Sequence, residues 1–287
     1  MKILDGKSLA LKIKNDIKLA IEQKSFLENS LPPKLAIIIV GNDPASLVYV
    51  AGKLKSCNYV GIKTELFQFE DDVSEETISK KIFELNADKI VNGILVQLPL
   101  PKHINAQKII NLISTEKDVD GLCEINLGKL LGNDNTAIHG STPSGIIALL
   151  KEYDINLVGK NVVIINRSLL VGKPLALMFL NEDATVTICH SKTKKLKEKT
   201  LLADIVVVGV GQINFLKSNM VKKGAIVVDV GINRNEKTNK IQGDVDFKNV
   251  CKKVRFITPV PNGVGPMTIA MLIKNTFEAS VFQNKIS

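Results

Sequence analysis

Aromatic residues, cysteine and histidine are scarce in this sequence, and each shortage excludes a class of protein. Tryptophan is absent and aromatic residues make up 5% of the 287 positions, so platforms for stacking nucleic-acid bases are few. The four cysteines form no C-x-x-C pair and the three histidines lie far apart, which disfavours a disulfide framework and a metal site. No apolar run could span a bilayer, and the N-terminus lacks the apolar segment of a signal peptide. We therefore expect a soluble, cytoplasmic protein without a membrane partner or a bound metal.

Acidic residues are fewer than basic residues in this chain. Lysine and arginine number 38 against 29 acidic residues, a formal net charge of +9. Such an excess is found in nucleic-acid-binding proteins, but here the basic residues are nearly all lysines spread along the chain. Anionic small molecules explain the charge equally well, because a basic cleft concentrates them. We favour a small-molecule substrate over nucleic acid.

The G-x-G-x-x-G fingerprint is missing, although the pattern around its usual place is present. Residues 162–165 predict a buried strand, 166–171 a polar turn and 172–174 a helix start, a layout that can hold a phosphate. Asn166 stands where a first glycine is expected, and we expect it to close the turn because Asn tolerates positive φ. An ordinary turn without a ligand fits the same pattern.

The end of the next predicted strand, 184–189, indicates which nucleotide such a site would bind. An NAD site carries Asp or Glu there to hold the ribose 2′-hydroxyl. This chain has Ser191 and Lys192 instead, and Arg167, one of only three arginines, lies in the preceding turn. Because guanidinium groups grip phosphate oxygens, we predict NADP as the cofactor.

Helices and strands are predicted to alternate, which indicates βαβ units and parallel sheets. The length suggests two domains, and apolar periodicity weakens between residues 115 and 141, where we place the passage between them. We predict an α/β protein with an N-terminal catalytic domain at 1–120 plus 265–287, a Rossmann-like NADP-binding domain at 121–264, and a cleft between them. Helices are expected at about 7–25, 45–60, from 74, at 105–113, 142–150 and from 266, and strands at 35–40, 63–69, 93–96, and near 162, 185, 205, 226 and 256.

A second group of polar residues falls in the first domain. Tyr49 and Lys53 are four apart on a predicted helix and share one face, where they could serve a heterocycle and a proton transfer or simply coat the helix. Gln97 ends an apolar strand before two prolines, at the strand end where α/β proteins bind ligands. Asp118 and Asp120 could bind the N–H edge of a heterocycle or cap a turn.

Taken together, these segments resemble the bifunctional methylenetetrahydrofolate dehydrogenase/cyclohydrolase family, the FolD type, over nearly the whole chain. The resemblance rests on several blocks in the right order: residues 40–46 with Tyr49 and Lys53, 93–101, 117–121, 167–168 with 171–174, 189–191, 229–233 and 258–268.

The resemblance implies NADP-dependent oxidation of 5,10-methylenetetrahydrofolate and hydrolysis of the product to 10-formyltetrahydrofolate, within the one-carbon metabolism that serves purine biosynthesis. It implies that Lys53 is the catalytic lysine, that Gln97 hydrogen-bonds it, that Tyr49 stacks on the folate and that Asp120 holds the pterin edge. It also implies a homodimer. The remaining matched positions are expected to contact the cofactor (Asn166, Arg167, Ser168, Ser191 and Ile232) or the folate (Leu98, Pro261 and Gly263).

Three residues depart from the family pattern. Asn166 and Asn262 replace glycines, and Ser141 replaces the cysteine of a Cys-Thr-Pro motif, a change for which we expect no catalytic effect. Two other functions stay open: a different NADP dehydrogenase of the shikimate dehydrogenase type, and a non-enzymatic binder of nucleic acid or anions. An assay for NADPH and formyl product separates all three.

Overall fold

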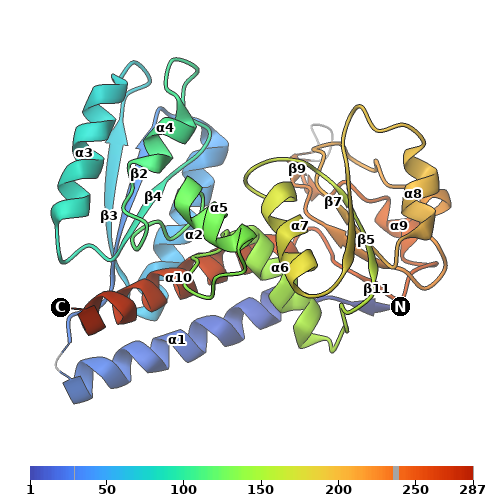
Figure 1. Ribbon diagram of the computed structural model, residues 1–287, viewed down its shortest axis with the longest axis horizontal. Coiled ribbons are helices and arrows are strands. Elements are labelled where there is room, and N and C mark those ends of the chain that lie inside the picture. The colour runs from blue at the N-terminus through green and yellow to red at the C-terminus, as the bar shows by residue number, and fades with distance from the viewer. Residues whose placement is uncertain (29, 235–238, 287) are drawn as a thin grey trace. The chain divides into compact units, whose positions relative to one another are not determined.

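The computed structural model describes residues 1–28, 30–234 and 239–286, which form two compact units (Figure 1). Unit 1 comprises Met1–Ala10 and Thr142–Thr268, and unit 2 comprises Leu11–Ser141 and Ile269–Ser287. Each unit contains a parallel sheet flanked by helices, so the predicted α/β class with two domains is confirmed.

Unit 1 is built on a six-stranded sheet whose pairings, within the described residues, are all parallel. The strand order is β1-β11-β8-β7-β5-β6, so the chain moves outward from β5 to β6 and then returns to the other side of β5 with β7. The carboxyl ends of β5 and β7 therefore lie at a topological switch point, where sheets of this kind bind ligands. The strands are β1 (Lys2–Ile3), β5 (Asn161–Ile165), β6 (Thr185–Cys189), β7 (Ile205–Val208), β8 (Ile226–Asp229) and β11 (Phe256–Ile257).

Helices and a short antiparallel pair complete unit 1. Apolar side chains of β5, β7 and β8 are buried, as expected for parallel strands covered on both faces. The other elements are α6 (Ser141–Glu152), α7 (Gly172–Asn181), α8 (Leu196–Leu202), the 3₁₀ turn η1 (Ser218–Met220), β9 (Asn233–Arg234), β10 (Ile241–Gln242) and α9 (Phe247–Val250).

Unit 2 is built on a three-stranded parallel sheet of order β3-β2-β4. Alternate residues of the central strand enter different cores: Leu35, Ile37 and Ile39 pack with residues of α1, α2 and α10, whereas Ala36 and Ile38 pack with residues of α3 and α4. The elements are α1 (Gly6–Glu28), β2 (Lys34–Val40), α2 (Pro44–Val60), β3 (Lys63–Phe69), α3 (Glu75–Ala87), β4 (Gly93–Val96), α4 (Ala106–Asn111), α5 (Glu124–Leu131) and α10 (Val264–Ile286).

Helix α2 has both of its ends specified by sequence. Asp43 caps the start by accepting from the Ser46 N–H, and Pro44 occupies the first turn. Gly61 ends the helix in the left-handed conformation with φ 89°. Ser74 likewise caps α3 by accepting from the Thr77 N–H at 3.2 Å, as its position predicted.

The grouping of residues differs from the predicted boundaries in three places, the smallest being residues 265–268, which were predicted in the catalytic domain and belong to unit 1. Residues 1–10 belong to unit 1, because β1 pairs with β11 and places Lys2 opposite Phe256. Residues 121–141, predicted as the start of the nucleotide domain, belong to unit 2 and contain α5, a helix that the sequence reading missed. The buried side chains of Asp118 and Asn126 hold this segment together, and contacts between polar side chains cannot be read from the pattern of apolar residues.

Within the described part of the chain, no helix combines the length and the apolar character needed to cross a membrane.

Candidate active site

Lys53 lies in the third turn of α2 and meets the end of strand β4. Its Nζ donates to Gln97 Oε1 at 2.9 Å. The Gln97 amide is oriented from its other side, because its Nε2 donates to the Leu98 carbonyl at 2.7 Å. The Gln97 N–H donates to the carbonyl of Ile38 on β2, which continues the sheet pairing to this residue. The acceptor for the Lys53 amine is therefore held by two hydrogen bonds of its own.

Burial changes the proton affinity of this site. It lowers the pKa of Lys53, since a charged amine is costly away from water, while the negative charge of Asp120 opposes the shift. One turn earlier on the same helix, Tyr49 is 37% exposed, and its partial burial raises the pKa of the phenol. Lys53 is thus an amine that loses its proton more readily than a surface lysine, next to an accessible aromatic ring.

Asp120 lies in the loop between α4 and α5, and side-chain hydrogen bonds anchor that loop. Burial raises the pKa of the Asp120 carboxyl, the charge of Lys53 lowers it, and the neighbouring Asp118 raises it. Asp118 is a structural residue here: its Oδ2 accepts from the Cys123 N–H at 2.8 Å and from Asn126 Nδ2 at 3.0 Å. Of the two acids left open by the sequence, Asp120 is the one coupled to Lys53.

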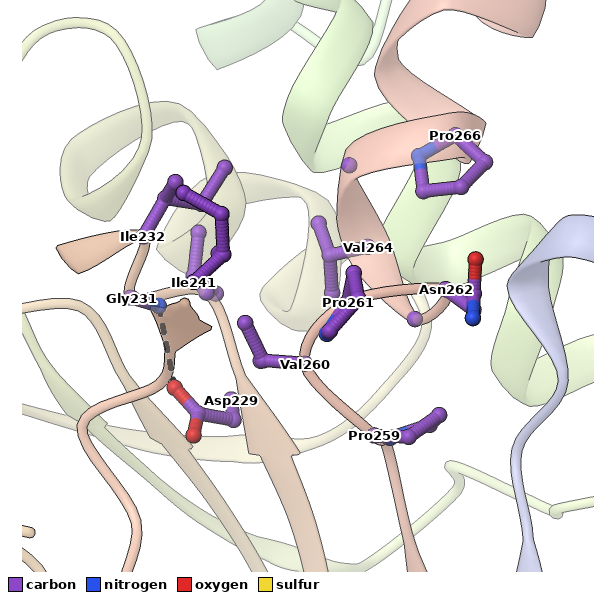
Figure 2. Close-up of a pocket in the computed structure, with 13 residues that line it drawn as sticks. Asp229, Gly231, Ile232, Ile241, Pro259, Val260, Pro261, Asn262, Val264 and Pro266 are labelled. Carbon is purple, nitrogen blue, oxygen red and sulfur yellow. Dashed lines mark hydrogen bonds between the residues drawn. The ribbon is translucent and has the colours of Figure 1, made fainter. Parts of the chain in front are cut away.

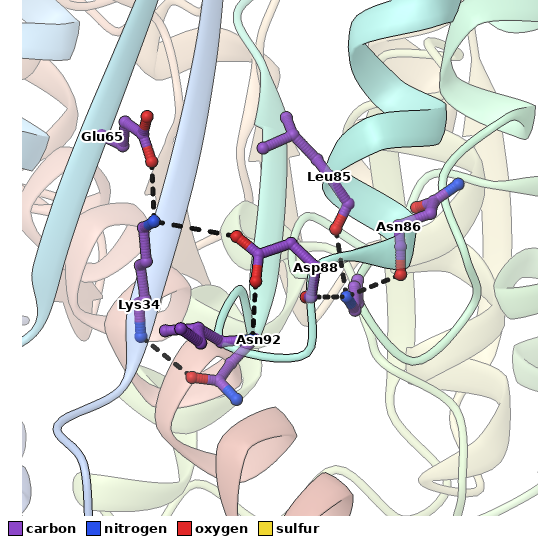
Figure 3. Close-up of polar contacts among 8 residues, drawn as sticks. Lys34, Glu65, Leu85, Asn86, Asp88 and Asn92 are labelled. Atoms are coloured by element: carbon purple, nitrogen blue, oxygen red, sulfur yellow. Dashed lines mark hydrogen bonds and ion pairs between the residues drawn. The ribbon is translucent and has the colours of Figure 1, made fainter.

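Lys117 anchors the same loop from its other end, on the residues Leu85, Asn86 and Asp88 that Figure 3 labels. Its Nζ donates to three backbone carbonyls at the end of α3, so all three N–H groups of the ammonium are hydrogen-bonded within the fold. Those acceptors are the carbonyls of Leu85, Asn86 and Asp88, at 3.1, 2.8 and 2.7 Å.

The cofactor-contact positions predicted in unit 1 follow the carboxyl ends of three parallel strands, so they lie at one edge of the sheet. Asn166, Arg167 and Ser168 follow β5, Ser191 follows β6, and Ile232 follows β8. Arg167, Ser168 and Ser191 are exposed, so the edge offers one guanidinium and two hydroxyls. That set of donors suits the phosphate and hydroxyl groups of a phosphorylated ribose.

Asn166 closes its turn in a different way from the one predicted. It is not among the residues with positive φ, so the expectation of a left-handed backbone there is wrong. Its side chain closes the turn instead. The Oδ1 atom accepts from the N–H groups of Ser168 and Gly172, and Nδ2 donates to the Gly209 carbonyl after β7. Asn166 thereby joins the two strand ends at the switch point. A glycine could not do this, because it has no side chain.

Ile232, Pro261 and Gly263 line one cavity of about 130 Å³ in unit 1 (Figure 2). The cavity therefore joins a predicted cofactor contact to two predicted folate contacts. Asn262, between the last two, has φ 83°, a conformation that glycine adopts freely and asparagine tolerates. This explains how asparagine can replace a glycine at that position.

Asp244 and Asp229 organise this edge, and neither role was predicted from the sequence. Asp244 is fully buried and gathers two loops by accepting from four donors. Asp229 accepts from the N–H groups of Gly231, Asp244 and Val245, and burial raises its pKa to about 6. For Asp229 the signal was an acid at the end of an apolar strand, whereas Asp244 lies in a polar stretch that gave no such signal. The donors to Asp244 are the N–H groups of Val210, Gly211 and Gln212 and Nδ2 of Asn233.

The fold thus brings the predicted residues together in two groups. Unit 2 holds Tyr49, Lys53, Gln97, Leu98 and Asp120, and unit 1 holds the five cofactor positions with Pro261 and Gly263.

Comparison with known proteins identifies both parts of the chain. The catalytic domain of tetrahydrofolate dehydrogenase/cyclohydrolase matches residues 4–120, and the NAD(P)-binding domain of the same family matches residues 140–284. The bifunctional protein FolD of Campylobacter hominis is 51% identical over 280 residues, which cover 98% of this chain and 97% of that protein.

Two solved structures resemble the fold closely. The bifunctional FolD methylenetetrahydrofolate dehydrogenase/cyclohydrolase of Campylobacter jejuni superposes with a TM-score of 0.96 at 47% identity, covering 98% of this chain and 99% of that one. The Trypanosoma brucei FolD, solved with NADP cofactor and inhibitor, has a TM-score of 0.93 at 33% identity and covers 98% of both chains. This chain belongs to the tetrahydrofolate dehydrogenase/cyclohydrolase family.

Proposed function

We propose that Lys53 is the proton-handling group of an enzyme that carries out two successive reactions on one folate. The enzyme oxidises 5,10-methylenetetrahydrofolate to 5,10-methenyltetrahydrofolate with NADP and hydrolyses that product to 10-formyltetrahydrofolate. Family membership over both domains and the activities named for the relatives support the reactions. The observation that carries the role of Lys53 is its half-buried amine, which donates to Gln97 Oε1 at 2.9 Å. A dehydrogenase of the shikimate type is set aside by the family assignment.

The oxidation step requires little acid–base catalysis by protein side chains. NADP, when bound, accepts the hydride, and the chain supplies binding and orientation. Arg167 and Ser191 would hold the phosphorylated ribose, and the turn of Asn166 and Ser168 with Ile232 would hold the rest. The exposed cation and hydroxyls at this sheet edge support that assignment.

The hydrolysis requires a group that can take up and release protons. The methenyl compound is a cation, so a second positive charge beside it is unfavourable and favours neutral Lys53. Burial already lowers the pKa of this lysine. Gln97 accepts from the amine and directs it, and the neutral amine then takes protons as water adds to the methenyl carbon.

The remaining residues bind the folate. Tyr49, one turn before Lys53, offers its ring for stacking, and the carboxylate of Asp120 accepts N–H groups of the pterin. Leu98, Pro261 and Gly263 complete the contacts. The hydrogen bond from Gln97 to the Leu98 carbonyl supports placing Leu98 beside the catalytic pair.

The chain acts as a cytoplasmic homodimer that supplies formyl groups for purine biosynthesis. Four cysteines without a disulfide suit a reducing compartment. Sedimentation equilibrium of the purified protein measures the assembly: a species of twice the chain mass is expected, and a monomer at micromolar concentration would contradict the homodimer.

Incubation with methylenetetrahydrofolate and NADP tests the function directly. NADPH should appear first and 10-formyltetrahydrofolate should follow. NADPH without formyl product would remove the hydrolase half, and no NADPH would remove the whole assignment. A protein that instead binds DNA in a salt-sensitive way, without turnover, would prove to be a nucleic-acid binder.

A further inference from the structure

One buried hydroxyl near the proposed site has no use in the mechanism above. Ser141, the first residue of α6, is 2% exposed, and its Oγ has no hydrogen-bond partner of standard geometry among the described residues. A buried hydroxyl without a partner costs stability, so its presence calls for an explanation.

The backbone places Ser141 beside the loop that carries Asp120. Gly121 (φ 63°) packs directly on the segment before Ser141: a Cβ added there would lie 2.5 Å from the Ile138 carbonyl and 2.7 Å from the Gly140 nitrogen. No residue with a side chain could take that position. The two segments are therefore in contact. Gly121, on one segment, directly follows Asp120, and Gly140, on the other, directly precedes Ser141.

Two asparagines fasten these segments together. Asn275 of α10 donates through Nδ2 to the carbonyls of Val119 and His139, at 2.9 and 3.0 Å. Asn126 accepts from the Ile138 N–H and donates to Asp118 Oδ2. These contacts hold the backbone of the Asp120 segment against that of the Ser141 segment.

We propose that Ser141 is a positioning residue for the folate reactions, with its hydroxyl donating to the Asp120 carboxylate and keeping that group ionised and oriented for substrate. The Ser141 hydroxyl acts on the Asp120 carboxyl, which has no backbone N–H donor among the described residues. This inference rests on the proposed function, because it assigns Asp120 to the folate. The cysteine usual in the family is a weaker donor than serine, so the proposal reverses the expectation, made from the sequence alone, that this exchange has no catalytic effect.

The charges around Asp120 agree with this role. Burial raises its pKa most, and Lys53 and the Ser141 hydroxyl lower it. Cys57, beside Lys53, has a pKa raised to about 12 by burial, and burial lowers the pKa of His139, so both are neutral at pH 7. Asp118 is the other charged group that acts on Asp120, and it raises the pKa. Loss of the Ser141 hydroxyl should therefore raise the pKa of Asp120 further.

Kinetics of Ser141→Ala and Ser141→Cys test the proposal, with Ser280→Ala as the control. Ser280 is also a buried serine of unit 2, 6% exposed, but its hydroxyl donates to the Phe277 carbonyl. For Ser141→Ala we expect KM for methylenetetrahydrofolate to rise about tenfold, since a hydrogen bond to a charged group is lost, and KM for NADP to stay within twofold. The acid limb of kcat/KM for the folate should move to higher pH, with Ser141→Cys between Ser141→Ala and the wild type.

Infrared spectroscopy provides a readout that does not depend on turnover. The carbonyl band of protonated Asp120, identified by its loss in Asp120→Asn, should persist to higher pH in Ser141→Ala than in the wild type. An unshifted band and a pH profile equal to that of Ser280→Ala would overturn the proposal, and so would equal rises in both KM values. If Ser141→Ala does not fold, Ser141→Cys gives the same two measurements. A wild type without turnover would refute the proposed function, whereas the infrared band would still decide the contact.

Discussion

One carboxylate in each unit, Asp244 in unit 1 and Asp120 in unit 2, illustrates two opposite kinds of surroundings. In unit 1, Asp244 accepts from three consecutive backbone N–H groups and from the side chain of Asn233. In unit 2, Asp120 receives no backbone N–H among the described residues, and its neighbours are the Lys53 charge and the Ser141 hydroxyl. A carboxylate surrounded by fixed donors shapes loops, whereas one with few donors keeps capacity for a substrate. Asp244 thus has a structural role in unit 1, whereas Asp120 belongs to a group of side chains that can act on a substrate.

Removal of the amine of Lys53 should produce the largest effect. Lys53→Met is expected to abolish measurable hydrolysis of methenyltetrahydrofolate, a loss of about 10²–10⁴-fold, because no other group replaces the proton carrier. NADP binding should be unchanged. Lys55→Met is the matched control, since Lys55 is exposed on the same helix. Full hydrolysis by Lys53→Met would remove this lysine from the mechanism.

The pH dependence of hydrolysis sharpens the same prediction. Burial lowers the pKa of Lys53 below the ordinary 10.5, and the neutral amine is the active form. The rate should therefore rise with pH through that lowered pKa and then level off. Lys53→Arg, which stays charged, should show no such rise. A rate that falls over this pH range would contradict the role of the neutral amine.

Loss of the charge of Asp244 should affect stability more than chemistry. In Asp244→Asn, an amide N–H₂ replaces an oxygen that accepts backbone N–H groups, and leaving such buried donors unpaired costs roughly 1–3 kcal/mol. The free energy of unfolding, measured with urea, should fall by about that amount, and NADP should bind more weakly. Asp154→Asn is the control, because Asp154 is exposed and its φ of 52° suits asparagine. Unchanged stability would show that these donors find other partners.

Asp120→Ala should weaken folate binding about tenfold to a hundredfold, as expected when a charge-assisted hydrogen bond is lost, and should affect NADP less. Calorimetric titration with tetrahydrofolate and with NADP measures both affinities. Equal losses would mean that Asp120 supports the fold and has no specific contact with the folate.

The smallest effect is expected at Arg167. Arg167→Ala should weaken NADP binding about tenfold and leave NAD binding unchanged, because the guanidinium would contact the additional phosphate. Arg255→Ala in the same unit is the control, since Arg255 lies over the ring of Phe256. A wild type that prefers NAD would contradict the choice of cofactor.

The comparison also shows what could be predicted and what could not. The strands 35–40 and 63–69 and the cap at Ser74 were predicted correctly, because apolar period and capping residues are local signals. Helix α5 was missed, since Asp118 and Asn126 hold its segment through buried polar contacts. The turn of Asn166 was located correctly but explained wrongly, because its side-chain acceptors and donors come from residues up to 43 positions away.

By itself, the sequence determined the α/β class, the edge where the strands end and the residue types at each site, because these depend on short-range periodicity and chemical identity. Only the tertiary structure decided which of two neighbouring acids is coupled to Lys53, that Asp244 gathers the loops of unit 1, and that Ser141 is buried beside Asp120. Those outcomes depend on contacts between distant segments and on exclusion of water, which alters the cost of charge in ways that no local pattern records.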